Sequence, residues 1–234
     1  QIMSTYSSDL KLELIATGDA SGTWGSDTNN NLNLIQQSVA GYQAIDVAGA
    51  DVTLAMTNKT ISNARNMTLE FTGTLAANRT VNFPASLEKV FNVIDSTNHA
   101  GYTLTFKVTS AAGFLLCEGN SYFCHSNGTN IIKDLEFRKW RAITAAETIQ
   151  AGAKILANTN GGAFTATLPA SPVIGDEVHF VDQGYDFNTN ALTIGRNSSN
   201  IANSAADLVV NTQGAAFGLV YSGDATTGWT YTEK

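Results

Sequence analysis

Short runs in which apolar and polar residues alternate dominate the chain beyond Ala48. Asn, Gly and Ser separate these runs, which include Asp51–Met56, Met67–Phe71, Val90–Ile94, Tyr102–Val108, Glu177–Val181 and Ala216–Tyr221. A period near two is typical of strands with one buried face. Regularly spaced short strands with turns between them indicate a sandwich or a barrel. The pattern therefore predicts a mostly β protein.

The β-rich part contains an internal repeat. Thr80–Ser86 aligns with Thr165–Ser171, and both segments contain Pro-Ala-Ser. Val90–Asp95 then aligns with Glu177–Asp182, with small insertions confined to turns. A duplicated module of under about 100 residues per copy is typical of a rod or a string of beads.

One helix is expected before the β-rich part, from about Thr28 to Ala40. Leu32, Ile35, Val39 and Tyr42 follow one another at helical spacing, with Asp27 or Thr28 as the N-cap and Gly41 near the end. A helix this short is marginal alone in water. Its apolar face is expected to be covered either by its own chain or by the same helix of another subunit.

These patterns predict a mostly β fold, with two tandem β-sandwich (jelly-roll-like) modules preceded by an extended arm and one short α-helix. The expected domains are an N-terminal arm and helix for anchoring and assembly, a first module and a second module, at residues 1–47, 48–139 and 140–234. The boundary between the modules falls near Arg138–Ile143, after a charged run.

The composition restricts the partners. Only 14% of the 234 residues are charged and the formal net charge is −7, whereas Thr, Ser and Asn together account for 67 residues. A nucleic-acid binder would need a stripe of Lys and Arg, which the chain lacks. The longest apolar runs are far shorter than the ~20 residues of a membrane-spanning helix. We therefore expect no nucleic-acid partner and no membrane partner.

Catalytic and metal motifs are incomplete. Gly18–Gly22 has the outline of a serine nucleophile loop, but Ala20 interrupts it and no triad can be assigned. Asp186–Asn190 alternates oxygen ligands as a calcium loop does, yet it lacks the turn glycine and the closing glutamate. We therefore assign no catalytic, cofactor-binding or metal residues, and read both segments as turns.

The cysteines and aromatic residues leave alternatives open. Cys117 and Cys124 do not have the spacing of a zinc site; buried thiols are the first interpretation and a hairpin disulfide is the second. Aromatic residues in or beside putative loops and strand ends are either core packing or platforms for a sugar: Tyr102, Tyr122, Tyr185, Trp229 and Tyr231.

Several segments resemble the tail-fibre and appendage structural proteins of marine tailed bacteriophages, particularly those that infect cyanobacteria. The resemblance lies in Leu10–Asp19, Ser21–Gly25, Thr28–Leu32, Ala64–Gly73 and Ser126–Asn130, and in the second module from Thr165 to Asn197. It implies a homotrimer in the virion, with an N-terminal part that binds other virion proteins and β-domains that project outward.

The function expected from this resemblance is that of a non-enzymatic appendage subunit that needs no cofactor. Trp24 beside Gly25 is the expected anchor, and Leu32, Ile35 and Val39 form the helix face that meets the symmetry mates. The alternatives are a glycan-binding adhesin for the host surface and a capsid decoration or head-fibre protein. A polysaccharide-degrading enzyme is disfavoured because the adjacent Asp176 and Glu177 would point to opposite faces of a strand.

Overall fold

The computed structural model describes residues 3–233, which form one α-helix, one short 3-10 helix and twenty strands. Contacts divide the chain into two compact units. The first runs up to Leu116 and includes Asn120–Phe137; the second comprises Cys117–Gly119 and the chain from Arg138 on. The arm and the helix belong to the first unit.

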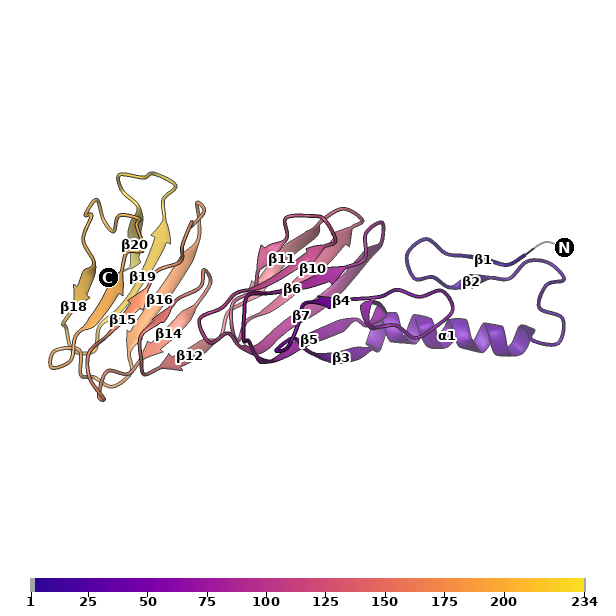
Figure 1. The fold of residues 1–234 in the computed structure, drawn as a ribbon, viewed down its shortest axis with the longest axis horizontal. Coiled ribbons are helices and arrows are strands. Elements are labelled where there is room, and N and C mark those ends of the chain that lie inside the picture. Colours follow the sequence, from indigo (N-terminus) through magenta and orange to yellow (C-terminus); the bar gives the residue numbers. More distant parts are fainter. Residues whose placement is uncertain (1–2, 234) are drawn as a thin grey trace. The chain divides into compact units, whose positions relative to one another are not determined.

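Each unit is a β-solenoid, and the two units together contain about six turns (Figure 1). The prediction of two β-sandwich, jelly-roll-like modules is therefore wrong. In a jelly roll, neighbouring strands pair antiparallel. Here the chain alternates between two sheets, and in the first three turns of each unit a strand pairs parallel with the strand one turn later. Alternation of apolar and polar residues is the same in both architectures, so it does not encode strand direction.

In the first unit, three turns each contribute one strand to a first sheet and one to a second. The first sheet has the order β11-β10-β7-β5-β3 and the second the order β4-β6-β8-β9. The parallel strands are followed by antiparallel β9, β10 and β11. The strands are β3 (Tyr42–Asp46), β4 (Val52–Thr53), β5 (Thr68–Thr74), β6 (Arg79–Phe83), β7 (Glu88–Asn98), β8 (Leu104–Val108), β9 (Phe114–Leu115), β10 (Ser121–Asn127) and β11 (Ile131–Phe137).

The second unit repeats this plan. Its sheets have the orders β12-β14-β16-β19-β20 and β13-β15-β17-β18, again with three parallel turns before antiparallel strands. The strands are β12 (Trp140–Ile143), β13 (Glu147–Thr148), β14 (Lys154–Ala157), β15 (Phe164–Thr167), β16 (Glu177–Asp182), β17 (Leu192–Gly195), β18 (Leu208–Val210), β19 (Ala216–Tyr221) and β20 (Trp229–Glu233).

The aligned repeat segments occupy equivalent places in the two units. Ser86 and Ser171, which close the two Pro-Ala-Ser segments, both have positive φ, at 60° and 51°. Asp95 and Asp182 end the equivalent stretches of β7 and β16, and both are buried. Asp95 accepts from the amide and hydroxyl of Thr97, and Asp182 accepts from the amides of Asp186, Phe187 and Gly214. In each unit, a buried carboxylate thus bonds to backbone and side-chain donors that follow it in the chain, within β7 in the first unit and in the loop after β16 in the second.

Each unit has its own apolar core between its two sheets. In the first, the rings of Phe71, Phe83, Phe91 and Phe106 pack in contact, with Phe83 stacked on Phe91 at 5.2 Å between centroids. In the second, Phe180 stacks on Phe217 at 5.3 Å. Such packing of rings from successive turns stabilises a solenoid, in which each turn buries its apolar face only against its neighbours.

Helix α1 spans Trp24–Ala40, and the arm before it forms a small hairpin of β1 (Thr5–Tyr6) and β2 (Glu13–Leu14). The helix ends where the sequence predicts and begins one turn earlier. Gly41 follows it because a Cβ there would lie 2.3 Å from the Gln37 carbonyl oxygen and 2.5 Å from Asn66 Oδ1. The 3-10 helix η1 (Asn63–Arg65) lies in the loop that packs beside α1.

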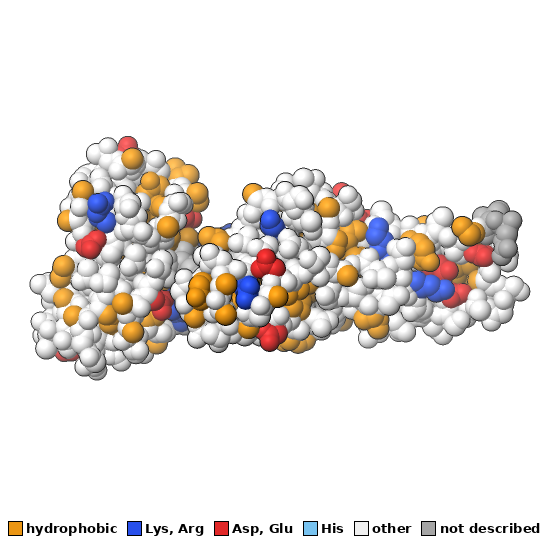
Figure 2. Space-filling view, in the orientation of Figure 1, with side chains coloured by type: hydrophobic (Ala, Val, Ile, Leu, Met, Phe, Trp, Pro, Cys, Tyr) orange, Lys and Arg blue, Asp and Glu red, His pale blue; other side chains and the backbone are white. Residues whose placement is uncertain are grey.

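The exterior contains little charge. In Figure 2, uncharged polar side chains and backbone form most of the visible surface, and charged groups are scattered across it. Within residues 3–233, no helix is sufficiently long and apolar to cross a membrane.

Lys89 gives the first unit a specific pH dependence. Burial lowers the pKa of this lysine to about 8, and its ammonium donates to the carbonyl oxygens of Asn66 and Val90. Between about pH 8 and the ordinary lysine pKa of 10.5, the unfolded chain holds the proton that the folded chain has lost, so stability rises with pH. We expect a gain on the order of 2–3 kcal/mol over this range.

Chemical denaturation at a series of pH values will measure this gain. Lys89→Met should remove it, whereas Lys107→Met, on neighbouring β8, should leave it in place. An identical pH profile for the wild type and Lys89→Met would contradict the prediction.

Candidate assembly surface on the N-terminal helix

Helix α1 has two different faces. The face toward its own chain is mainly polar: Asp27 and Leu34 are buried, and Asn30, Asn31 and Gln37 are partly buried. Asn residues are poor helix formers, so this helix depends on tertiary contacts. Asn31 supplies two of them, since its side chain accepts from the Glu13 amide at 2.9 Å and donates to the Glu13 carbonyl at 2.8 Å.

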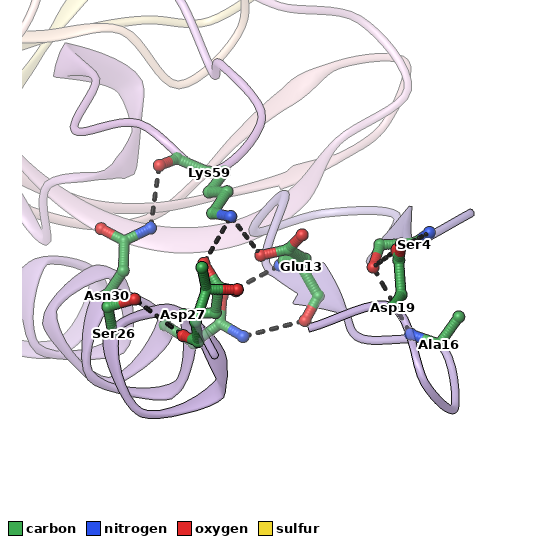
Figure 3. Close-up of polar contacts among 10 residues, drawn as sticks. Ser4, Glu13, Ala16, Asp19, Ser26, Asp27, Asn30 and Lys59 are labelled. Atoms are coloured by element: carbon green, nitrogen blue, oxygen red, sulfur yellow. Dashed lines mark hydrogen bonds and ion pairs between the residues drawn. The ribbon is translucent and has the colours of Figure 1, made fainter. Parts of the chain in front are cut away.

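Lys59 joins the arm, the helix and the loop before η1 (Figure 3). Its ammonium lies 2.6 Å from a carboxylate oxygen of Glu13 on β2 and 2.6 Å from one of Asp27 on α1. Its main-chain carbonyl accepts from the Asn30 side chain at 2.9 Å. The hydrogen bond to Asp27 is the largest cause of the raised pKa of Lys59, and the bond to Glu13 is the second. The bond between Lys59 and Asp27 is also the largest cause of the lowered pKa of Asp27.

Arg65 is a second residue that joins the arm and the helix. It is fully buried, and its guanidinium donates to the carbonyl oxygens of Leu10, Thr57 and Thr60. It also donates to Ser62 Oγ at 3.1 Å and to Gln37 Oε1 at 3.4 Å. Burial lowers the pKa of this guanidinium. One cation therefore bonds to the arm, the loop of residues 57–62 and α1.

The opposite face of the helix is apolar and exposed. Leu32, Ile35 and Val39 are 58%, 40% and 69% exposed, and Tyr42, just after the helix, is 57% exposed. Together with Gly25 and Thr28 they follow a spacing of three and four residues, which is the heptad spacing of coiled-coil seams. We call the set Leu32, Ile35, Val39 and Tyr42 the helix stripe. The helix therefore packs its polar face on its own chain and leaves its apolar face uncovered.

Trp24, the expected anchor, begins the helix and is 65% exposed. It borders a cleft of about 470 Å³ formed with the turn of the arm at residues 15–21. Gly25 is exposed beside it. All five candidate residues thus lie on one helix, with the helix stripe on its exposed face and Trp24 at its start.

The other sequence candidates lie elsewhere. Gly18–Gly22 is a turn, in which Asp19 accepts from the amide and hydroxyl of Ser4. Asp186 bonds to Asn190 within its own loop. Within the described part of the chain, no three His, Cys, Asp or Glu residues gather as a metal site would require. Cys117 and Cys124 are both buried, lie in different units and form no disulfide with each other.

The aromatic candidates differ in exposure. Tyr122 and Trp229 are core residues, whereas Tyr102 and Tyr185 are 40% and 67% exposed. Tyr231 is partly buried and packs against the second core.

The sequence interpretation missed Lys59 and Arg65. Both lie in a stretch without apolar periodicity, and their partners come from the arm and the helix, up to 55 positions away. A signal was present in the segment Ala64–Gly73, which carries part of the phage-fibre resemblance and contains Arg65. An arginine with no neighbouring carboxylate in sequence is otherwise read as a surface residue.

No protein-family model matches the chain, and no curated protein matches it. Among solved structures, one described as "Structure of a chaperone-substrate complex" is similar over 81% of this chain and 35% of that chain, with 19% identity and a TM-score of 0.37. This chain thus spans about a third of the length of that one, and the likeness is too low to support an argument about function.

Proposed function

We propose that this protein is a non-enzymatic structural subunit of a bacteriophage virion appendage, assembled as a homotrimer through α1 and docked on the particle by its N-terminal part. The observation that supports it best is the uncovered helix stripe. Exposed apolar side chains that lie next to one another along a helix mark an interaction surface. A stripe with heptad spacing fits the same stripe on another copy.

The order of residues in the stripe favours three copies over two. With Leu32 and Val39 at the a positions, Ile35 occupies a d position. Leucine at a with isoleucine at d shifts parallel helices from dimers toward trimers and tetramers. A three-fold assembly also presents three copies of the Trp24 cleft side by side, and such multivalency strengthens a weak contact with the particle.

The remainder of the chain suits a projecting part. Each turn of a solenoid adds length and buries its apolar face against the next turn, so extended units can be stable. The surface of Thr, Ser and Asn stays hydrated with little charge. The virion assignment itself depends on the resemblance of Leu10–Asp19, Ala64–Gly73 and the second module to phage fibres.

Two measurements test the proposal. Light scattering of the full chain should give about three times the chain mass of 24.8 kDa. Antibody labelling of virions of the phage that encodes the chain, viewed by electron microscopy, should mark an appendage on the tail or the head. A monomeric mass would overturn the trimer, and unlabelled virions would overturn the virion role.

A further inference from the structure

The outer face of the sheet β11-β10-β7-β5-β3 in the first unit is unusually apolar. Val90, Leu135 and Phe137 are 49%, 57% and 58% exposed on it, and Ile132 is 37% exposed. Strand register places them in adjacent rows: Val90 is paired with His125, which is paired with Ile132 on its other side. Phe123 is paired with Leu135, and Ser121 with Phe137. We call Val90, Phe123, Ile132, Leu135 and Phe137 the sheet patch.

The sheet patch lies on the same outer face of the sheet as Tyr42 of the helix stripe, with the polar residues Thr68 and Asn92 between them. Tyr42 belongs to the stripe and is also the first residue of β3. Register runs from Tyr42 through Thr68 and Asn92 to Phe123 and Leu135, so one outward row crosses the whole sheet. The Tyr42 hydroxyl donates to Glu70 on the same face. An interface that covers Val39 and Tyr42 would thus extend naturally onto the sheet.

The second unit provides an internal comparison. By their strand pairing, three residues of the sheet patch have equivalents in the second unit. Val90 corresponds to Glu177, Phe123 to Gly218 and Leu135 to Glu233. On that face Glu177 is paired with Arg138 at 2.6 Å, and His179 lies within 3.7 Å of both Glu177 and Glu233. Trp140 on the same face is capped by the ammonium of Lys154 at 5.5 Å. At the positions of Val90 and Leu135, the second unit therefore has glutamates where the first has apolar residues.

We propose that the sheet patch is a second part of the subunit interface and packs against another copy of this chain. This inference rests on the proposed trimer and extends its contact from α1 to the first β unit. The charged and titratable groups at outward positions of this face include Asp46, Glu70, Glu88, Asp134 and His125, so its charge is negative. An anionic membrane surface would instead select Lys and Arg around the apolar residues.

Thiol accessibility tests the proposal. Leu135→Cys places a probe in the sheet patch, and the native cysteines do not interfere because both are buried and burial raises the pKa of the Cys124 thiol to about 12. We expect a maleimide to react about tenfold more slowly with the thiol at position 135 in the assembled chain than in the same chain carrying Leu32→Asp and Val39→Asp. Val209→Cys, an exposed position on β18 of the second unit, should react at the same rate in both backgrounds.

The outcomes separate this inference from the proposed trimer. Protection at position 135 but not at position 209 supports the sheet patch as an interface. Equal rates at position 135 in a chain that light scattering shows to be trimeric would overturn the sheet patch and leave the trimer intact. A wild-type chain that is monomeric in solution would overturn both proposals.

Discussion

Replacing Arg65 with methionine should lower the free energy of unfolding of the first unit by about 2–4 kcal/mol, because several backbone acceptors lose their donor, and should release the arm from the helix. The methionine fills most of the same space but donates no hydrogen bonds. The carbonyl oxygens of Leu10, Thr57 and Thr60 would remain without the donor that they have now. A buried acceptor that loses its donor costs about 1–3 kcal/mol, and the cost is smaller where water can replace the donor, as at the exposed residues Thr57 and Thr60.

Denaturant unfolding and limited proteolysis of the arm measure the two parts of this expectation. Arg65→Lys should give an intermediate loss, because an ammonium cannot reach three segments as a planar guanidinium does. Arg79→Met is the matched control: Arg79 donates to the carbonyl oxygens of Ala48 and Gly49 in the same unit, but is only partly buried. Its loss should cost about 1 kcal/mol. A stable Arg65→Met protein with a protected arm would contradict the role of Arg65.

The sequence pattern predicted the positions of many strands but not which strands pair with one another. Alternation located β5, β7, β8, β16 and β19 because those strands have one buried face. It could not assign partners, and the turns of the solenoid are too unequal to show a period. The register from β3 to β5 to β7 advances by 26 and then 24 residues, whereas that from β12 to β14 to β16 advances by 14 and then 25.

The helix shows which features can be predicted from local sequence signals and which cannot. Its end was predictable from Gly41, but its start was placed near Thr28 because Asp27 resembled an N-cap. In the structure, Asp27 lies inside the first turn, accepts from the Thr23 hydroxyl at 2.8 Å and pairs with Lys59. The helix stripe was readable because it depends on spacing within one element. The contacts of Lys59 and Arg65 with the arm and the helix could not be predicted, because the loops and the arm come together only in the folded chain.

Introducing aspartate at two positions of the helix stripe, Leu32→Asp with Val39→Asp, should convert a trimer into a monomer and reduce the measured mass threefold. In a three-helix seam, each of these side chains buries surface worth roughly 1.5–3 kcal/mol per copy. The substitution would also place like charges from three chains close together in a poorly solvated seam. Because both residues are exposed within one chain, the fold of the monomer should be preserved.

The matched control adds the same two charges to the same helix, away from the stripe. Ser26 and Asn33 are exposed polar residues one position after Gly25 and Leu32, so Ser26→Asp with Asn33→Asp should remain trimeric by light scattering. Circular dichroism of both variants checks that the helix is retained, which separates loss of assembly from loss of folding. If the stripe variant keeps the wild-type mass, the subunits do not associate through α1. If it becomes monomeric and keeps its helix while the control stays trimeric, the apolar face of α1 is the contact that holds the subunits together.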